Sequence, residues 1–397
     1  MQRLERITNI PKRYEKLPEN TLYDVIGFRH ENAEKAAEAF ADKNSCVYGR
    51  IAHPNTNALA QIYRDLEGGE DAVILSSGMA ATTTLVLALC TSGDYIVSSN
   101  RIYGGTYTLF EKFLPAKNNI YTEFVSEPDN FASWESVRDL HDKPPKLFFL
   151  ETPGNPLLGV YDIGEIAKLA HSYGAPLVVD NTMGLGIQKP LELGADVSLS
   201  SLTKVATRGK KTGGVIIGSK QLIENCLDVR KNIGACMDHE VAFEVTKDAC
   251  SIAQRMKRHS ENAFLLAYDL ACRGYQVYYP GFANEFELSL VNKQMGGYGG
   301  VLLSFDVEGG QSRAMRLLNI LHDEGILDIV THFGEDKITT GVHPASTTHS
   351  GMDKEAREKA GISDGLLRIS ADANRTFKRT TLKRFMKALD VFEKENH

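Results

Sequence analysis

Two stretches of the sequence place reactive side chains directly after apolar runs. Residues 176–179 form a short apolar run rich in β-branched residues, and Asp180 follows it. Such a run predicts a buried strand, which would carry the Asp180 carboxylate at its carboxyl end. The next apolar run, 197–199, is followed by residues 200–204, which read Ser-Ser-Leu-Thr-Lys. The end of this second strand therefore carries hydroxyl groups and the amine of Lys204.

Open α/β sheets bind ligands beyond the carboxyl ends of their strands, so these groups would meet at one edge. An acid, hydroxyls and one lysine suit pyridoxal 5'-phosphate (PLP). Lys204 would form the Schiff base, Asp180 would keep the ring nitrogen protonated, and the hydroxyls of Ser201 and Thr203 would bind phosphate. Taken alone, the same residues also fit an ordinary turn, because Asp-Asn-Thr is common turn chemistry and Ser-x-Thr-Lys is a short motif.

A second candidate anion site lies earlier in the chain. Residues 71–75 predict a strand, 76–78 a tight turn, and 79–90 an apolar helix. A glycine-bearing turn that opens a helix directs unpaired backbone N–H groups and the positive end of the helix dipole at one point. Ser77, Gly78 and Met79 are therefore candidates for binding a phosphate group.

The motifs occur in an order that resembles the Cys/Met metabolism family of PLP enzymes, the cystathionine γ-synthase-like family. The resemblance extends from about Tyr48 to Ser370, nearly the whole chain. An ordered set of this extent is more specific than any single motif in it. The motifs are Ser77-Gly78-Met79, Tyr103-Gly104-Gly105-Thr106, Glu151-Thr152-Pro153-Gly154-Asn155-Pro156, Asp180-Asn181-Thr182, Ser201-Leu202-Thr203-Lys204 and His343-Pro344-Ala345-Ser346-Thr347-Thr348-His349.

The resemblance implies further cofactor contacts. Tyr103 would stack on the cofactor ring, move protons and face the substrate; a buried core tyrosine is the alternative. Asn155 would hydrogen-bond the phenolic oxygen of PLP, and Thr182 would line the same site. Tyr48 and Arg50 would reach the phosphate of a neighbouring subunit's cofactor, although without the resemblance a surface Tyr-Gly-Arg turn is preferred.

The resemblance also implies a substrate site in the C-terminal part of the chain. Arg368 would grip the α-carboxylate of an amino-acid substrate, a two-pronged task that lysine performs poorly. Thr339 would lie near the same carboxylate. After Ser370 the sequence continues Ala-Asp-Ala-Asn where relatives commonly have a glycine and an acid. His343 and His349 lack carboxylate or cysteine companions, so we expect no metal site there and read both as structural.

Seven candidate strands alternate with helices between residues 71 and 218, which predicts a mainly parallel sheet covered on both faces. This pattern matches the large domain of the type I PLP-dependent transferase fold, an α/β fold. We expect an arm at 1–52 that contacts a neighbouring subunit, a PLP-binding domain at 53–250, and a smaller α+β domain at 251–397. Helices are expected at 54–66, 159–173, 221–230, 249–272, 312–324 and 380–394.

The resemblance implies γ-replacement on an activated homoserine, as in O-acetylhomoserine sulfhydrylases and cystathionine γ-synthases. Methionine γ-lyases typically have a cysteine after Tyr-Gly, whereas this chain has Gly105. The alternative is γ-elimination, as in methionine or cystathionine γ-lyases, giving 2-oxobutyrate, ammonia and a thiol. A non-catalytic PLP-binding relative is the alternative of another class, suggested by the basic, glycine-rich loop at 205–212.

Bulk composition sets outer limits on function. The 397 residues carry 45 basic and 51 acidic side chains, a net charge of -6, and no basic stripe that would predict nucleic-acid binding. No apolar run is long enough to span a membrane, and the N-terminal sequence lacks the apolar core of a signal peptide. We therefore expect a cytoplasmic protein with six reduced structural cysteines. If Tyr48 and Arg50 serve a neighbouring subunit, as the resemblance implies, a single chain has an incomplete site, so we expect a homo-oligomer, a dimer at least and a tetramer by preference.

Overall fold

The computed structural model describes residues 5–7, 21–42, 45–139 and 143–394. Most of the N-terminal stretch on which the signal-peptide argument depended lies outside these residues. The chain divides into two compact units: unit 1 comprises Met1–Leu89 and Leu199–Ser251, and unit 2 comprises Cys90–Ser198 and Ile252–His397. The division expected from the sequence, at residues 52 and 250, stays a prediction.

The strands between Asp71 and Gly218 confirm the expected seven-stranded sheet, with the order β3-β9-β8-β7-β6-β4-β5. The pairs β4–β5, β4–β6 and β6–β7 are parallel, whereas the edge strand β3 runs antiparallel to β9. Every residue of β6 and β7 is buried, as expected for parallel strands with both faces covered. The strands are β3 (Asp71–Leu75), β4 (Tyr95–Ser99), β5 (Tyr121–Val125), β6 (Leu147–Glu151), β7 (Leu177–Asp180), β8 (Val197–Ser201) and β9 (Gly214–Gly218).

The helices of unit 1 begin and end at recognisable capping residues. In α2 the His53 side chain accepts a hydrogen bond from the Asn55 N–H, and Gly68 ends the helix at a φ of 78°. Glycine adopts this left-handed conformation without steric cost, so the helix stops there. The helices are α1 (Ala33–Ala41), α2 (Pro54–Glu67), α3 (Gly78–Leu89), α8 (Lys220–Ile233) and α9 (His239–Ala249).

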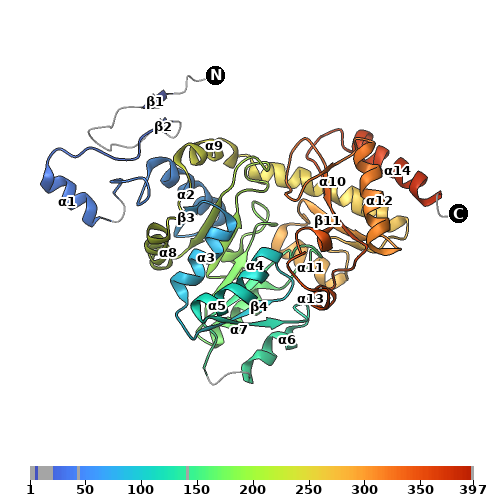
Figure 1. The fold of residues 1–397 in the computed structure, drawn as a ribbon, viewed down its shortest axis with the longest axis horizontal. Coiled ribbons are helices and arrows are strands. Elements are labelled where there is room, and N and C mark those ends of the chain that lie inside the picture. Colours follow the sequence, from blue (N-terminus) through green and yellow to red (C-terminus); the bar gives the residue numbers. More distant parts are fainter. Residues whose placement is uncertain (1–4, 8–20, 43–44, 140–142, 395–397) are drawn as a thin grey trace. The chain divides into compact units, whose positions relative to one another are not determined.

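Unit 2 also contains a five-stranded sheet with the order β10-β11-β14-β13-β12. Helices α10, α12 and α14 lie around this sheet in Figure 1 and share an apolar core with it. The strands are β10 (Val277–Tyr278), β11 (Leu302–Asp306), β12 (Asp328–Ile329), β13 (Thr340–Val342) and β14 (Leu366–Ser370). The helices of this region are α10 (Ile252–Cys272), α11 (Glu285–Met295), α12 (Gly310–Asp323), α13 (Lys354–Lys359) and α14 (Lys383–Lys394).

Three helix starts differ from the sequence prediction by three or four residues, among them α14, which begins at Lys383 where 380 was expected. The helix expected from residue 159 begins at Ile163, as α7 (Ile163–Ser172), because Asp162 caps it by accepting the N–H groups of Gly164 and Glu165. The remaining helices of unit 2 are α4 (Gly104–Thr108), α5 (Leu114–Asn118) and α6 (Phe131–Glu135). The helix expected from 249 begins at Ile252, and α9, capped by Asp238, precedes it.

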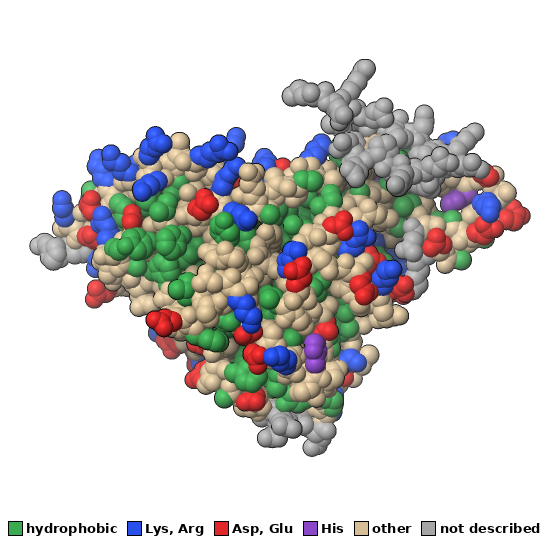
Figure 2. Space-filling model, turned by 180° about the vertical axis from the view of Figure 1, so that it is seen from behind, with side chains coloured by type: hydrophobic (Ala, Val, Ile, Leu, Met, Phe, Trp, Pro, Cys, Tyr) green, Lys and Arg blue, Asp and Glu red, His purple; other side chains and the backbone are tan. Residues whose placement is uncertain are grey.

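Acidic and basic side chains lie interspersed on the face drawn in Figure 2, in keeping with their near balance in the sequence. Within the part of the chain that the structure describes, no helix combines the length and apolarity that crossing a membrane requires.

Asn55 ties the arm to the body of unit 1. Its Oδ1 accepts the N–H of Tyr23, 3.1 Å away, and its Nδ2 donates to the carbonyl of Thr21, 2.8 Å away. Both residues belong to β2 (Thr21–Tyr23), which pairs in parallel with β1 (Glu5–Ile7). A buried amide that satisfies one donor and one acceptor of the same strand fixes the position of that strand.

We expect Asn55→Ala to lower the free energy of unfolding by about 1–3 kcal/mol, because it leaves buried backbone groups of β2 without partners. Amide hydrogen exchange at Tyr23 should accelerate. Asn55→Asp is the comparison variant: it keeps the acceptor for Tyr23 but sets a carboxylate oxygen against the Thr21 carbonyl, so it should destabilise the protein while exchange at Tyr23 accelerates less than in the alanine variant. Unchanged exchange at Tyr23 in the alanine variant would contradict this account.

Candidate active site

The parallel pair β6–β7 brings two carboxylates together at the carboxyl end of the sheet in unit 2. Glu151 is the register partner of Asp180. Both side chains are buried, with exposed fractions of 3% and 8%. Asp180 accepts the backbone N–H of Thr182, 3.0 Å from its Oδ1. The predicted acid therefore lies at a strand end, and a second acid that the sequence reasoning gave no role lies beside it.

Glu151 joins two of the predicted cofactor residues. Its Oε2 accepts the backbone N–H of Tyr103 at 2.6 Å, and its Oε1 accepts that of Asn155 at 2.9 Å. Burial and the neighbouring Asp180 raise the pKa of Glu151 well above its ordinary value, while the two N–H donors and Arg368 act in the opposite direction. One signal in the sequence could have identified Glu151: like Asp180, it ends an apolar run.

Arg368 lies within the same set of residues. It is buried on β14, where Nη1 donates to Oδ1 of Asn155 at 3.1 Å and Nη2 donates to the carbonyl of Thr331 at 2.9 Å. The guanidinium also lies 5.5 Å from the ring centroid of Phe333. Burial lowers the pKa of Arg368 to about 10, so the side chain still carries its charge at neutral pH. A buried cation of this kind suits a carboxylate ligand.

His349 is buried near Arg368. Burial and the Arg368 charge lower its pKa to about 4, although backbone hydrogen bonds to Asn155 and Ile102 act in the opposite direction. The imidazole is therefore neutral at physiological pH. His343 lies between Ser346 Oγ and the carbonyl of Asp364, each 2.8 Å from one ring nitrogen. Both histidines thus occupy buried positions in hydrogen-bonded loops.

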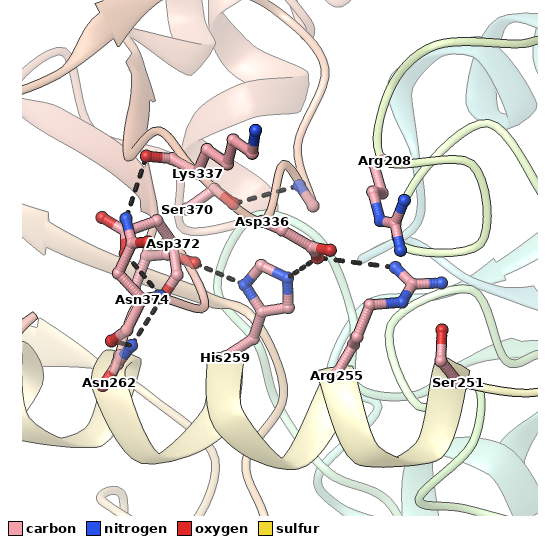
Figure 3. Close-up of polar contacts among 12 residues, drawn as sticks. Arg208, Ser251, Arg255, His259, Asn262, Asp336, Lys337, Ser370, Asp372 and Asn374 are labelled. Carbon is pink, nitrogen blue, oxygen red and sulfur yellow. Dashed lines mark hydrogen bonds and ion pairs between the residues drawn. The ribbon is translucent and has the colours of Figure 1, made fainter. Parts of the chain in front are cut away.

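Thr339 is buried, and its hydroxyl donates to Oδ2 of Asp372 at 2.8 Å. Asp372 belongs to the segment after Ser370 in which the chain departs from its relatives. Helix α10 holds this segment (Figure 3): His259 Nδ1 lies 2.7 Å from the carbonyl of Ala371, and Asn262 Nδ2 donates to the carbonyl of Asp372 at 2.7 Å. Asp336 faces the other ring nitrogen of His259 at 3.2 Å. The altered segment is thus tied to α10 by buried polar contacts.

In unit 1 the predicted phosphate turn packs closely against the end of β8. Ser77 Oγ accepts the N–H of Ala80, 3.0 Å away, at the start of α3. A Cβ atom at Gly78 would lie 2.7 Å from Cβ of Ser201. Only glycine allows this approach, so the start of α3 packs directly against the Ser201 side chain. Such a helix start is suited to a phosphate group.

The loop that carries Lys204 is held by its own hydrogen bonds. Thr203 Oγ1 accepts the N–H of Gly213 at 3.2 Å, and the Lys204 carbonyl accepts the N–H of Gly209 at 3.2 Å. Helix α9 pairs with two of the three cations in the departing 205–212 loop. The pairs are Arg208 with Asp248 and Lys211 with Glu244, both at 2.9 Å. Those two cations are engaged in ion pairs with α9.

Tyr48 and Arg50 lie on the surface of unit 1. The Arg50 guanidinium is 5.7 Å from the centre of the Tyr48 ring, and its Nη1 donates to the carbonyl of Lys231. Both side chains are exposed in the single chain. The predicted reach of Tyr48 and Arg50 toward a neighbouring subunit stays a prediction.

The structure thus brings the predicted residues together in two sets, each within one unit. Unit 2 joins Asp180, Asn155, Tyr103 and Arg368 around Glu151. Unit 1 joins Ser77, Gly78 and Ser201. Glu151 and the carbonyl of Thr331 are the additions that sequence reasoning missed.

The family model of the Cys/Met metabolism PLP-dependent enzymes matches residues 10–374. The chain belongs to this family. The PLP-dependent enzyme is 35% identical over 355 residues to an O-succinylhomoserine sulfhydrylase of Pseudomonas aeruginosa. The matched region covers 88% of this chain and 85% of that protein. It is 34% identical to a methionine gamma-lyase of Arabidopsis thaliana over 83% of this chain and 75% of that one.

Solved structures show the same fold over nearly the full length of the enzyme. A cystathionine gamma synthase from Xanthomonas oryzae pv. oryzae has a TM-score of 0.84 at 29% identity, covering 94% of this chain and 93% of that one. A putative O-acetylhomoserine (thiol)-lyase from Campylobacter jejuni has a TM-score of 0.85 at 26% identity, covering 94% and 97%. The latter structure contains a pyridoxyl-lysine-5'-monophosphate. The expected type I fold is confirmed.

The cofactor of the enzyme is PLP, and the residues described here fit it. Gly78 at the start of α3 packs against Ser201, so the positive end of the helix dipole lies beside the Ser201 hydroxyl, a combination that suits a phosphate group. Asp180 is a buried carboxylate that can face a protonated ring nitrogen.

We expect Gly78→Ala to weaken PLP binding at least about tenfold, equivalent to about 1.4 kcal/mol, because the added methyl group displaces Ser201 or the turn. Equilibrium dialysis of PLP against the purified protein measures this loss. Gly27→Ala is the matched control in the same unit, since a Cβ there meets no atom within 4 Å. Equal PLP affinity in the two variants would contradict the assignment of the turn to phosphate.

Proposed function

We propose that the enzyme catalyses γ-replacement on an activated homoserine. In this reaction a thiol or sulfide forms a C–S bond at Cγ of an O-acyl homoserine, the C–O bond breaks, and the acyl group leaves as a carboxylate. Several relatives support the proposal, among them the O-succinylhomoserine sulfhydrylase and an O-acetyl-L-homoserine sulfhydrylase of Corynebacterium glutamicum that is 31% identical.

The observation that carries the choice of replacement is the space beside Tyr103. A Cβ atom at Gly105 would lie 2.5 Å from Cε1 of the Tyr103 ring. A cysteine at this position, which the family resemblance associates with methionine γ-lyases, therefore requires a different placement of the ring. Elimination is the second candidate, because methionine gamma-lyases are also among the relatives.

The side chains divide the work as follows in this proposal. Lys204 binds the cofactor covalently and carries the proton that leaves Cα and returns elsewhere on the substrate. Asp180 holds the ring nitrogen protonated, and PLP when bound accepts the electron pair released at Cα. Tyr103 stacks on the ring and assists proton transfer. Arg368 orients the substrate by its carboxylate, which fixes the position of Cα relative to the amine.

The remaining assignments complete the site. Ser77, Gly78 and Met79, with Ser201 and Thr203, bind the phosphate. Asn155 and Thr182 line the ring, and Thr339 lies toward the carboxylate end of the substrate. The extended arm, the PLP-binding domain at 53–250 and the α+β domain at 251–397 belong to the same proposal, as does a cytoplasmic location.

A product assay tests the reaction. We expect purified enzyme to convert O-acetylhomoserine or O-succinylhomoserine with sulfide into homocysteine faster than it releases 2-oxobutyrate from methionine or cystathionine. Lys204→Ala should abolish turnover and the visible absorbance of the bound cofactor. Faster 2-oxobutyrate release from methionine would replace this proposal with elimination. A Lys204→Ala variant that keeps both colour and turnover would overturn the lysine assignment.

Completeness of the site in one chain is a separate question. We propose that Tyr48 and Arg50 bind the phosphate of a second subunit's cofactor, so that a dimer is the smallest active form and a tetramer the preferred one. Light scattering combined with activity across a dilution series measures this. Activity per chain should fall as the dimer dissociates, and an active monomer would contradict the proposal.

A further inference from the structure

We propose that Glu151 is a positioning residue of the PLP site, holding Tyr103 and Asn155 at a fixed distance from each other and from Asp180. The inference rests on the proposed assignment of those three residues to the cofactor. It adds a residue for which neither the motifs nor the proposed reaction supplied a role.

The Glu151 carboxyl group links two separate backbone segments. Glu151 ends β6, and its two oxygens accept hydrogen bonds from two different segments: Tyr103, which follows β4, and Asn155, in the turn after β6. The backbone of each segment is bound to one oxygen of a single rigid carboxylate. Displacement of one segment relative to the other therefore breaks one of these two hydrogen bonds.

Glu151 and Asp180 are also coupled electrostatically. Glu151 is register partner of Asp180, and both carboxyl groups are buried. Two adjacent buried acids repel each other unless cations or donors compensate them. The two N–H donors and Arg368 offset only part of this cost, and the pKa of Glu151 stays well above its ordinary value. A protonated ring nitrogen on Asp180 adds compensation on the other side, so cofactor binding and the charge of Glu151 are coupled.

The chain contains a matched carboxylate without these neighbours. Glu287 is also buried, and its Oε1 accepts the N–H of Val160 at 3.1 Å. Its Oε2 accepts the N–H groups of Gly281 and Ala283 at 3.0 and 3.1 Å. Glu287 thus joins backbone segments of unit 2 in the same manner, but none of these three hydrogen bonds reaches Tyr103, Asn155 or Asp180.

The experiment compares Glu151→Gln with Glu287→Gln in the holoenzyme. A glutamine places an N–H₂ group against one of the backbone donors, so each variant loses a hydrogen bond and some thermal stability. Only Glu151→Gln should weaken PLP binding, by about ten- to a hundredfold. It should also change the visible circular dichroism of bound PLP, which reports the orientation of the ring, and lower kcat more than it changes KM.

Three outcomes would overturn the inference: wild-type PLP affinity and dichroism in Glu151→Gln, equal losses in both variants, or a change in KM alone. Glu151→Asp serves if the glutamine variant does not fold. It keeps the charge but is one methylene shorter, so its dichroism should also change. Failure of the proposed function has a different signature, namely retention of colour and turnover by Lys204→Ala in an otherwise wild-type chain.

Discussion

Two buried carboxylates, side by side at the carboxyl ends of parallel strands β6 and β7, impose the main constraint on this enzyme. Burying an acid is costly unless donors or cations face it. The loops after β4, β6 and β7 supply backbone N–H groups to Glu151 and Asp180, and Arg368 supplies a charge. The loop conformations that position the predicted cofactor residues are therefore the same ones that lower the free-energy cost of burying the two acids.

Arg368 connects this region to the second sheet of unit 2. Its guanidinium is held by the Asn155 side chain and the Thr331 carbonyl, and its strand continues into a segment bound by His259 and Asn262 of α10. The unusual residues after Ser370 thus serve packing against α10. Because these contacts are buried, they fix the position of the arginine without contributing to the chemistry themselves.

In unit 1 the proposed phosphate site lies at the start of a helix, not in the basic loop after Lys204. The helix start at Gly78 packs so closely against Ser201 that a side chain is excluded. The basic loop after Lys204 looks like an anion site in the sequence, yet Arg208 and Lys211 pair with carboxylates of α9. The net charge of a segment therefore does not predict an anion site unless the ion-pair partners of its side chains are known.

The sequence by itself determined the seven strands, the mainly parallel type of their sheet, and the family. Apolar runs and ordered motifs are local properties of the chain, so they can be read without the structure. The sequence placed Asp180 and Lys204 at strand ends for the same reason. Tertiary structure alone decided that Glu151 joins Tyr103 to Asn155 and that Arg368 contacts Asn155. It also decided that α9 precedes α10 and occupies two cations of the 205–212 loop. Hydrogen bonds and ion pairs between residues distant in sequence depend on strand register and helix packing, which no local pattern encodes.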